Sequence, residues 1–300
     1  MRPGNRLVSP ETRERTLMRN LLLAAAASLA TFGPALAACP DDTAVQALSR
    51  SILANSPAPA LTGMTDLADG QCAQDKLVPL MVPHLGQPVG YKVGLTNAAA
   101  QQRFGVPHPV TGTIYQQTIA LRSGGEVPAR FGAVPNVEAD LLVRVSSEAI
   151  NQARTHLDVL RAIDLVIPFI EMPDLVLSGG MDGPNLLAIN VGARLGVVGD
   201  AIPVEVTEEF AARLGTMTVT LASDQREIAR APGTALLGHP LNVIPWLAED
   251  LARRGERMRV GQYISLGGFS PAVAAEAGRT YTVRYEGLLA QPVSVSVRTH

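Results

Sequence analysis

The sequence has few aromatic residues and no excess of positive charge. Aromatic side chains make up 4% of its 300 residues, and 25 basic residues stand against 27 acidic ones, for a formal net charge of −2. Proteins whose main partner is nucleic acid carry a basic excess that neutralises phosphates, so no nucleic-acid partner is expected here. Hydrophobic residues make up 47% and charged residues 17%, which excludes a disordered chain.

Several catalytic motifs are also missing. The sequence contains no G-x-S-x-G segment, which argues against a hydrolase with a nucleophilic serine on a strand-to-helix turn. It contains neither a Walker phosphate-binding pattern nor the glycine pattern of dinucleotide-binding proteins. A zinc site is a poor explanation for two cysteines and five histidines that include no C-x-x-C pair.

The first 37 residues predict export. Basic residues, the apolar run LLLAAAASLATFG and small residues at Ala35 and Ala37 form the pattern of a cleaved signal peptide. The run is short for a retained membrane helix, and no comparable run follows it. Met18 is an alternative start that gives a signal of ordinary length. We therefore expect a signal peptide at residues 1–37, a periplasmic mature protein and no membrane span after cleavage.

Two cysteines, Cys39 and Cys72, follow the predicted signal peptide. In an oxidising compartment a disulfide between them is expected, because it explains both residues. Residues 36–39, Leu-Ala-Ala-Cys, also fit a lipoprotein signal. In that alternative a lipid on Cys39 anchors the protein and Cys72 remains a free thiol.

The mature chain predicts a helical part at 38–86 followed by a β-rich part at 87–300, together forming a single domain. Helices are expected at 43–55, 72–85 and 240–254, the last with Pro240 in its first turn and Gly255 at its end. Apolar alternation predicts strands at 89–95, 117–122, 136–146, 163–171, 187–198, 216–222, 280–286 and 292–298. This content predicts an α+β fold with one sheet packed on another.

The most informative strand carries Glu138 and Asp140, which the period of two places on the same face. Adjacent carboxylates repel each other, so a cation or a shared proton usually holds them together. The alternative is a solvated face on which Arg144 forms a salt bridge. A third carboxylate, Glu171, ends the apolar run 165–170, where a buried acid needs a partner.

Five segments resemble the fumarylacetoacetate hydrolase superfamily and, within it, the 2-oxopent-4-enoate (2-hydroxypentadienoate) hydratases. They occur in family order between about residues 43 and 298. The segments are GYKVGLT at 90–96, PNVEAD at 135–140, AIDLVIPFIE at 162–171, LGHPLN at 237–242 and the glycine-rich stretch at 261–271. The resemblance implies a fumarylacetoacetate-hydrolase-like mixed β-sandwich or roll with a small N-terminal helical part.

The resemblance also implies a divalent cation, Mg²⁺ or Mn²⁺. An acid-x-acid pair and a third acid bind the metal in that family, and these positions fall on Glu138, Asp140 and Glu171. Asp164 is a rival for the third ligand. We choose Glu171 because the family's proline, followed after two residues by the acid, matches the segment that begins at Pro168.

Three further residues fall on the family's site by resemblance. Lys92 matches the active-site lysine and is expected to be catalytic, the alternative being a surface lysine whose stem covers apolar surface. His239 is expected to contact substrate, although it could instead be a structural residue at a helix start. Asn190, retained from the family's Ala-Asp-Asn-Ala-Ser stretch, is also expected to bind substrate.

The chain departs from the hydratases at several positions that handle protons or contact substrate in the family. Val110 stands in place of the acid in their Pro-Asp-Phe-Gly stretch. Ile189 and Gly192 replace an acid and a hydroxyl. Their Leu-Thr-Gly near the C-terminus becomes Ser265-Leu266-Gly267-Gly268.

The resemblance therefore predicts a carbon–oxygen lyase, a metal-dependent hydratase-like enzyme that acts on a small 2-oxo or 2-hydroxydienoic acid through a metal-chelated enolate. Two alternatives within the superfamily are decarboxylation of a 2-oxo-enedioate and hydrolysis of an acylpyruvate. From another class comes a periplasmic protein that binds 2-oxo acids without converting them, which the departures favour. A homo-oligomer is compatible with the sequence.

Overall fold

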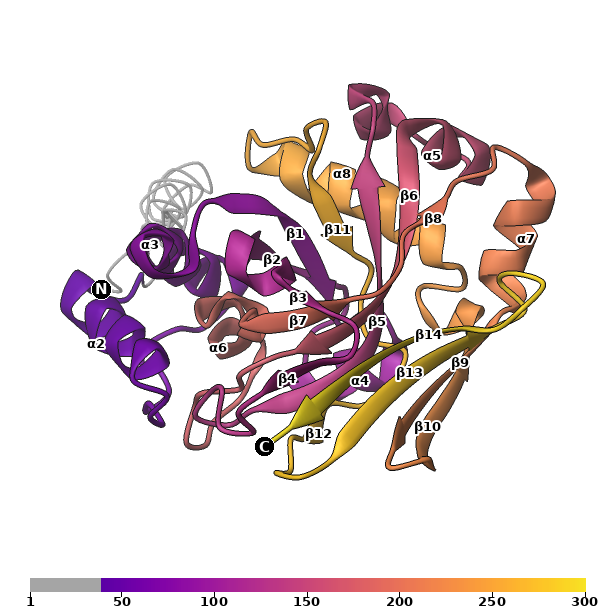
Figure 1. Ribbon diagram of the computed structural model, residues 1–300. Coiled ribbons are helices and arrows are strands. Elements are labelled where there is room, and N and C mark those ends of the chain that lie inside the picture. Colours follow the sequence, from indigo (N-terminus) through magenta and orange to yellow (C-terminus); the bar gives the residue numbers. More distant parts are fainter. Residues whose placement is uncertain (1–38) are drawn as a thin grey trace, which may run out of the picture. The chain divides into compact units, whose positions relative to one another are not determined.

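The computed structural model describes residues 39–300, which build two β-sheets and several helices (Figure 1). The predicted signal peptide at 1–37 and the alternative start at Met18 lie outside the described residues. The α+β class predicted from the sequence is confirmed, and the predicted small helical part precedes the strands.

Two helices form this helical part. α2 (Asp42–Leu53) begins at Asp41, whose side chain accepts a hydrogen bond from the Ala44 N–H. α3 (Leu67–Leu85) begins at Asp66 and is five residues longer at its start than the predicted 72–85. The extra length follows from a capping box, in which the side chains of Asp66 and Asp69 accept each other's backbone N–H groups.

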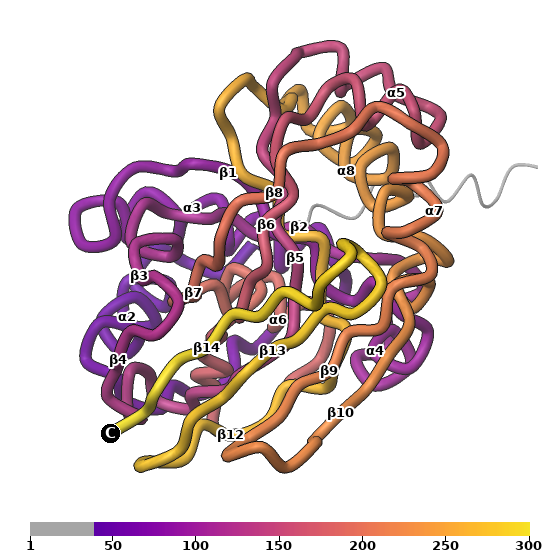
Figure 2. The backbone as a smooth tube through the Cα atoms, turned by 45° about the vertical axis from the view of Figure 1, so that its right-hand side comes forward, coloured from indigo at the N-terminus to yellow at the C-terminus, as the bar shows by residue number. Residues whose placement is uncertain are grey.

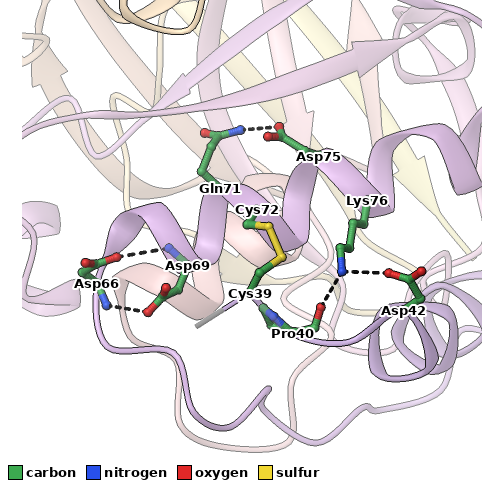
Figure 3. The surroundings of a disulfide bond; sticks show 9 residues. All are labelled: Cys39, Pro40, Asp42, Asp66, Asp69, Gln71, Cys72, Asp75 and Lys76. Atoms are coloured by element: carbon green, nitrogen blue, oxygen red, sulfur yellow. Dashed lines mark hydrogen bonds and ion pairs between the residues drawn. A yellow bond between two sulfur atoms is a disulfide. The ribbon is translucent and has the colours of Figure 1, made fainter. Parts of the chain in front are cut away.

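A disulfide joins Cys39 to Cys72 of α3, as Figure 3 shows. Next to it, Lys76 Nζ lies 2.7 Å from Asp42 Oδ1 and donates to the Pro40 carbonyl oxygen at 2.9 Å. The predicted disulfide is therefore confirmed. The bond uses the Cys39 thiol that a lipid anchor would need.

The larger sheet has nine strands. Its main path runs in the order β2 (Val110–Tyr115), β1 (Pro88–Gly94), β11 (Tyr263–Ser265), β5 (Asn136–Val145), β6 (Ile163–Met172), β7 (Leu195–Val198) and β3 (Leu121–Arg122). Two short strands pair off this path, β12 (Val273–Ala274) with β5 and β8 (Ile202–Pro203) with β6. The sheet is mixed, because β1 pairs with β11 in parallel whereas β5 pairs antiparallel with both of its neighbours.

The second sheet has the strand order β10 (Arg226–Pro232), β9 (Thr218–Ser223), β13 (Thr280–Glu286), β14 (Val293–Thr299) and β4 (Gly125–Val127). Figure 2 shows β14, β13, β9 and β10 side by side. The main hydrophobic core includes inward residues of both sheets, such as Leu141, Ile170 and Val283. Tyr285 of β13 ties the sheets together, because its hydroxyl donates to the Asp140 carbonyl oxygen and accepts from the Phe169 N–H.

Five further helices follow α3: α4 (Ala98–Phe104), α5 (His156–Ala162), α6 (Gly183–Ala188), α7 (Glu208–Thr216) and α8 (Val243–Arg253). Phe210 of α7 and Leu247 of α8 are completely buried in the main core. α4 has no buried residue. Among residues 39–300, no helix combines the length and the apolar content that a membrane crossing requires.

Two predicted strands are wrong. Residues 187–198 instead contain the end of α6, the turn η3 (Asn190–Gly192) and the short β7, because Asp182 caps α6 and the backbone turns left-handed at Asn190. Residues 117–122 contain the 3-10 helix η1 (Gln116–Ile119) and the two-residue β3. The predicted helix 240–254 begins as the 3-10 turn η5 (Pro240–Asn242), and Gly255, with φ 71°, follows its end.

We predict that replacing Cys39 and Cys72 together by alanine lowers the free energy of unfolding by about 3 kcal/mol, because the bond closes a loop of about 30 residues in the unfolded chain. Urea unfolding of protein purified without reductant measures the loss. The single variant Cys39→Ala should lose as much as the double variant. Alkylation of two thiols in unreduced wild-type protein, or a mass that includes diacylglycerol, would contradict the pairing.

Candidate functional site

A cavity of about 370 Å³ lies beside the end of the large sheet that carries Glu138 and Glu171. Its walls are mainly apolar and come from β1, α4, α6 and the stretch 268–272. Four charged side chains also line it: Lys92, Arg103, Glu138 and Glu171. A concave apolar pocket with a few convergent charged groups is the usual form of a small-molecule site.

Neighbouring strands bring three of these charges together. Glu138 of β5 lies directly opposite Glu171 of β6 in the antiparallel register. Lys92 of β1 is paired with Ser265 of β11, the strand that separates β1 from β5. The structure thus brings together three of the residues that the sequence predicted for the site.

Lys92 is buried, with 5% of its surface exposed, and forms an ion pair with Glu171. Its Nζ also donates to the Val191 carbonyl oxygen at 2.9 Å. Burial lowers the pKa of Lys92 to about 8, although the negative charges of Glu138 and Asp140 oppose the shift. The surface-lysine alternative is therefore wrong, and a lysine with this pKa can exchange a proton near neutral pH.

An uncommon backbone conformation presents the Val191 carbonyl to Lys92. Asn190 and Val191 have φ values of 55° and 53°, a region that β-branched residues rarely occupy. The Asn190 side chain accepts from the Thr113 N–H at 2.7 Å and from Gln74 Nε2 at 3.0 Å, and donates to the Thr113 carbonyl oxygen. Asn190 does not line the cavity, so its predicted substrate contact gains no support and its position makes it a positioning residue for Lys92.

Glu138 and Asp140 share a face of β5 but have different surroundings. Glu138 lines the cavity, and burial together with the charge of Asp140 raises its pKa to about 7, against the effects of Lys92 and Arg103. Asp140 is completely buried behind the cavity wall, where Ser265 Oγ donates to Oδ2 at 2.5 Å and the Gly267 N–H to Oδ1 at 3.0 Å. Burial raises the pKa of Asp140, and these hydrogen bonds act against the rise.

The donor set suits a hard cation, because carboxylate oxygens are the ligands that Mg²⁺ and similar ions prefer. Glu138 and Glu171 reach the cavity, and the hydrogen bonds on Asp140 are of the kind that orient metal-binding carboxylates. As they stand, no three His, Cys, Asp or Glu side chains between residues 39 and 300 are grouped to hold an ion. The three-carboxylate ligand set stays a prediction, in which a cation replaces Lys92 as the partner of Glu171.

Two alternatives for these carboxylates gain no support from the structure. Arg144 donates to Asp164 from Nε at 2.9 Å and from Nη2 at 2.6 Å, and both side chains are partly exposed. Neither residue lines the cavity. Asp164 therefore forms its ion pair with Arg144. Arg144 is not the salt-bridge partner of Glu138 or Asp140.

His239 lies outside the cavity lining. Its Nδ1 accepts from the Leu241 N–H at 3.1 Å, its Nε2 lies 2.9 Å from the Ala211 carbonyl oxygen, and its ring stacks on His156 at 3.8 Å between centroids. Both ring nitrogens are therefore used by the backbone. The structure favours the structural role at a helix start, and the predicted substrate contact gains no support.

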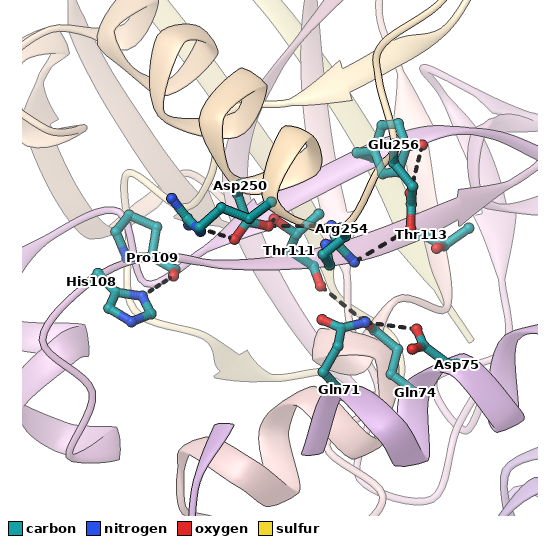
Figure 4. Close-up of polar contacts among 12 residues, drawn as sticks. Gln71, Gln74, Asp75, His108, Pro109, Thr111, Thr113, Asp250, Arg254 and Glu256 are labelled. Atoms are coloured by element: carbon teal, nitrogen blue, oxygen red, sulfur yellow. Dashed lines mark hydrogen bonds and ion pairs between the residues drawn. The ribbon is translucent and has the colours of Figure 1, made fainter. Parts of the chain in front are cut away.

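The residues that replace the hydratase side chains have structural roles. Val110 and Leu266 are buried in hydrophobic clusters, and Gly192 has φ 70° in a turn. Thr111, which follows Val110, is held by two hydrogen bonds (Figure 4). Its hydroxyl donates to Asp250 at 2.8 Å, and its carbonyl oxygen accepts from Gln74 at 2.9 Å. Val110, Ile189 and Gly192 do not line the cavity, whereas Gly268 does.

The cavity has polar residues that the sequence reasoning missed. Thr96 is 1% exposed, and within residues 39–300 its hydroxyl has no hydrogen-bond partner. Ser270 Oγ accepts from the Ala139 N–H at 3.0 Å, which leaves its own hydrogen available to a ligand. Arg103 projects from α4. Thr96 belongs to the GYKVGLT segment, whose polar end could have drawn attention to it.

No protein-family model matches the chain. A 2-keto-4-pentenoate hydratase from Paraburkholderia phymatum is 31% identical over 201 residues, which cover 67% of this chain and 75% of the relative. A 4-oxalocrotonate decarboxylase from Pseudomonas putida is 31% identical over 202 residues, or 67% and 74% of the two chains. The solved structure of 4-oxalocrotonate decarboxylase from Pseudomonas putida G7, complexed with magnesium and adipate, has a TM-score of 0.74 and 28% identity, covering 86% of this chain and 97% of that chain.

We predict that Glu138 makes the protein less stable as the pH rises from about 4.5 to about 7, the range between its ordinary and its raised pKa. The folded state binds this proton more tightly than the unfolded chain, so the stabilisation is complete below pH 4.5 and lost as the pH passes 7. The slope is at most about 1.4 kcal/mol per pH unit.

Urea unfolding at a series of pH values, with a chelator present, measures this slope. Glu138→Gln should remove it, whereas Glu148→Gln, at an exposed glutamate of η2 (Glu148–Gln152), should retain it. An unchanged slope in Glu138→Gln would show that the Glu138 carboxyl has an ordinary pKa.

Proposed function

This chain belongs to the fumarylacetoacetate hydrolase superfamily, with 2-keto-4-pentenoate hydratases and 4-oxalocrotonate decarboxylases among its relatives, and we propose that it is a metal-dependent lyase acting on a small 2-oxo or 2-hydroxydienoic acid. The observation that carries the proposal is the arrangement of Lys92, Glu138 and Glu171 on one cavity wall. Opposite charges buried beside a ligand-sized cavity are typical of acid–base chemistry on a bound substrate.

Glu138 and Glu171, with Asp140 behind them, would hold a divalent cation. The cation would supply Lewis-acid stabilisation of the negative charge that develops on the 2-oxygen of the substrate. The magnesium in the decarboxylase structure and the donor set of this chain both support a divalent cation. Asp140 keeps the strand β5 in place through Ser265 and Gly267.

Lys92 would move the proton. Its pKa of about 8 leaves the amino group partly neutral near neutral pH, so it can accept a proton from a carbon next to the 2-oxo group and return it elsewhere. The Val191 carbonyl oxygen orients the amino group from outside the cavity. The apolar walls, which include Leu95 and Phe269, exclude water from the substrate chain, and the free hydroxyl hydrogen of Ser270 can donate to a substrate oxygen.

Decarboxylation of a 2-oxo-enedioate is the second candidate reaction. It uses the same stabilised enolate, and a positively charged Arg103 in the cavity wall favours a substrate with a second carboxylate. The alternative of a binding protein without turnover is tested by the exchange experiment below. That alternative requires substrate binding without proton exchange.

We further propose that the protein works in the periplasm. The signal-peptide pattern at 19–37 supports this location. The disulfide between Cys39 and Cys72 also supports it, because such bonds persist in oxidising compartments and are rare in the cytosol.

We predict that Mg²⁺ or Mn²⁺ raises the Tm of chelator-treated protein, because an ion that binds only the folded state stabilises it by mass action. Glu138→Ala and Glu171→Ala should each abolish the rise, measured by differential scanning calorimetry against metal concentration. Asp164→Ala is the matched control and should keep it. The ligand assignment would be wrong if Asp164→Ala lost the response and Glu171→Ala kept it.

We predict that the protein catalyses exchange of solvent deuterium at C3 of a 2-oxo acid, and that the exchange requires Mg²⁺ and Lys92. Proton NMR of 2-oxopentanoate in D₂O, with and without Mg²⁺, follows the reaction. Lys92→Met should slow exchange by about 10²–10⁴-fold, the usual contribution of a general acid–base group.

Lys76→Met is the matched control, because Lys76 is the other lysine of the chain and pairs with Asp42 beside the disulfide. It should leave the exchange rate unchanged. Tight binding of several 2-oxo acids without any exchange would overturn the enzyme and favour the binding protein.

A further inference from the structure

We propose that Arg103 binds a second carboxylate at the far end of the substrate, so that this site takes 2-oxo dicarboxylic acids in preference to 2-oxo monocarboxylic acids. The inference rests on the proposed function, since it assumes that the first carboxylate and the 2-oxygen lie at the end of the cavity that holds Glu138 and Glu171. It assigns Arg103 as the residue that determines specificity.

The position of Arg103 differs from that of the other charges. Lys92 and Glu171 are 5% and 3% exposed, so they form the floor of the cavity, whereas Arg103 is an exposed residue and lines the mouth. It comes from α4, not from the large sheet. A substrate whose reacting end lies on the floor therefore presents its other end toward Arg103.

Arg103 has a charge that nothing in the described part of the chain pairs. Among residues 39–300 no carboxylate lies within ion-pair distance of its guanidinium, while Lys92 is paired with Glu171. The Arg103 side chain lines the same cavity as Glu138. An unpaired guanidinium presents parallel N–H donors that match a carboxylate, which is the group that this residue is suited to bind.

The Arg103 guanidinium lies over the ring of its neighbour Phe104. Its guanidinium carbon lies 5.4 Å from the centroid of the Phe104 ring, which also lines the cavity. Between floor and mouth the lining is apolar and includes Val93, Leu95 and Leu186. An apolar wall between two polar ends fits a short hydrocarbon chain with an acidic group at each end.

The test compares two probes of equal length, adipate with two carboxylates and hexanoate with one. Isothermal titration calorimetry of wild-type protein with Mg²⁺ should give an affinity for adipate at least about tenfold above that for hexanoate. Arg103→Gln should weaken adipate binding by about tenfold to a hundredfold, the range for a hydrogen-bonded charged group, and bring the ratio of the two affinities close to one. Arg103→Lys should keep part of the preference.

Arg161→Gln, which removes a positive charge from α5, is the matched control and should leave the ratio unchanged. The fold should tolerate Arg103→Gln, because α4 has no buried residue. Absence of adipate binding, or a parallel loss of both affinities, would overturn the inference, the second because Arg103 would then serve the carboxylate that both probes share. Failure of deuterium exchange with an intact adipate preference would instead overturn the proposed reaction and leave the role of Arg103 standing.

Discussion

The antiparallel register between β5 and β6 places Glu138 opposite Glu171, and the cavity depends on it. On the other face of the same strands, Ala139 lies opposite Ile170 in the main core. A slip of β5 by one residue would turn Glu138 into that core and move its apolar residues to the other face, at a large cost in free energy. The core therefore fixes the register, and the register fixes the distance between the two acids. Stability and chemistry are specified here by the same hydrogen-bonded ladder.

The buried charges beside the cavity are stabilised by neighbouring groups of opposite charge or by hydrogen-bond donors. A buried lysine or glutamate without a partner is strongly destabilising, and Lys92 and Glu171 meet this requirement by pairing with each other. Asp140 meets it differently, through donors on β11 and on the stretch that follows it. The second sheet adds Tyr285, whose hydroxyl bridges the backbones of β5 and β6 next to these residues. Because Lys92, Glu171 and Asp140 already have partners, a cation bound at Glu171 would exchange one partner for another and would not create a new buried charge.

The sequence predicted those features that depend on local pattern or on residues within one strand. The long alternating strands belong to this group, and the cysteine pair follows from the presence of only two cysteines. The expectation that Lys92, Glu138 and Glu171 share one site came from the family resemblance, because the three residues lie on three different strands. The hydrogen bonds of Asn190 and His239 could not be foreseen, because they go to backbone groups of distant elements that only the tertiary fold brings near. Arg103 was missed because α4 is seven residues long with no buried face, so it has no apolar periodicity to reveal it.

The left-handed backbone at Asn190 and Val191 has a consequence for the order of folding. Such a conformation costs about 1–3 kcal/mol per residue and persists only where the surroundings impose it. The surroundings here are Gln74 of α3 and Thr113 of β2, which lie 116 and 77 residues away along the chain. The turn can therefore settle only after these distant elements have docked. The acceptor for Lys92 therefore depends on the docking of α3 against the large sheet, so a chain in which α3 has not docked would lack a competent site.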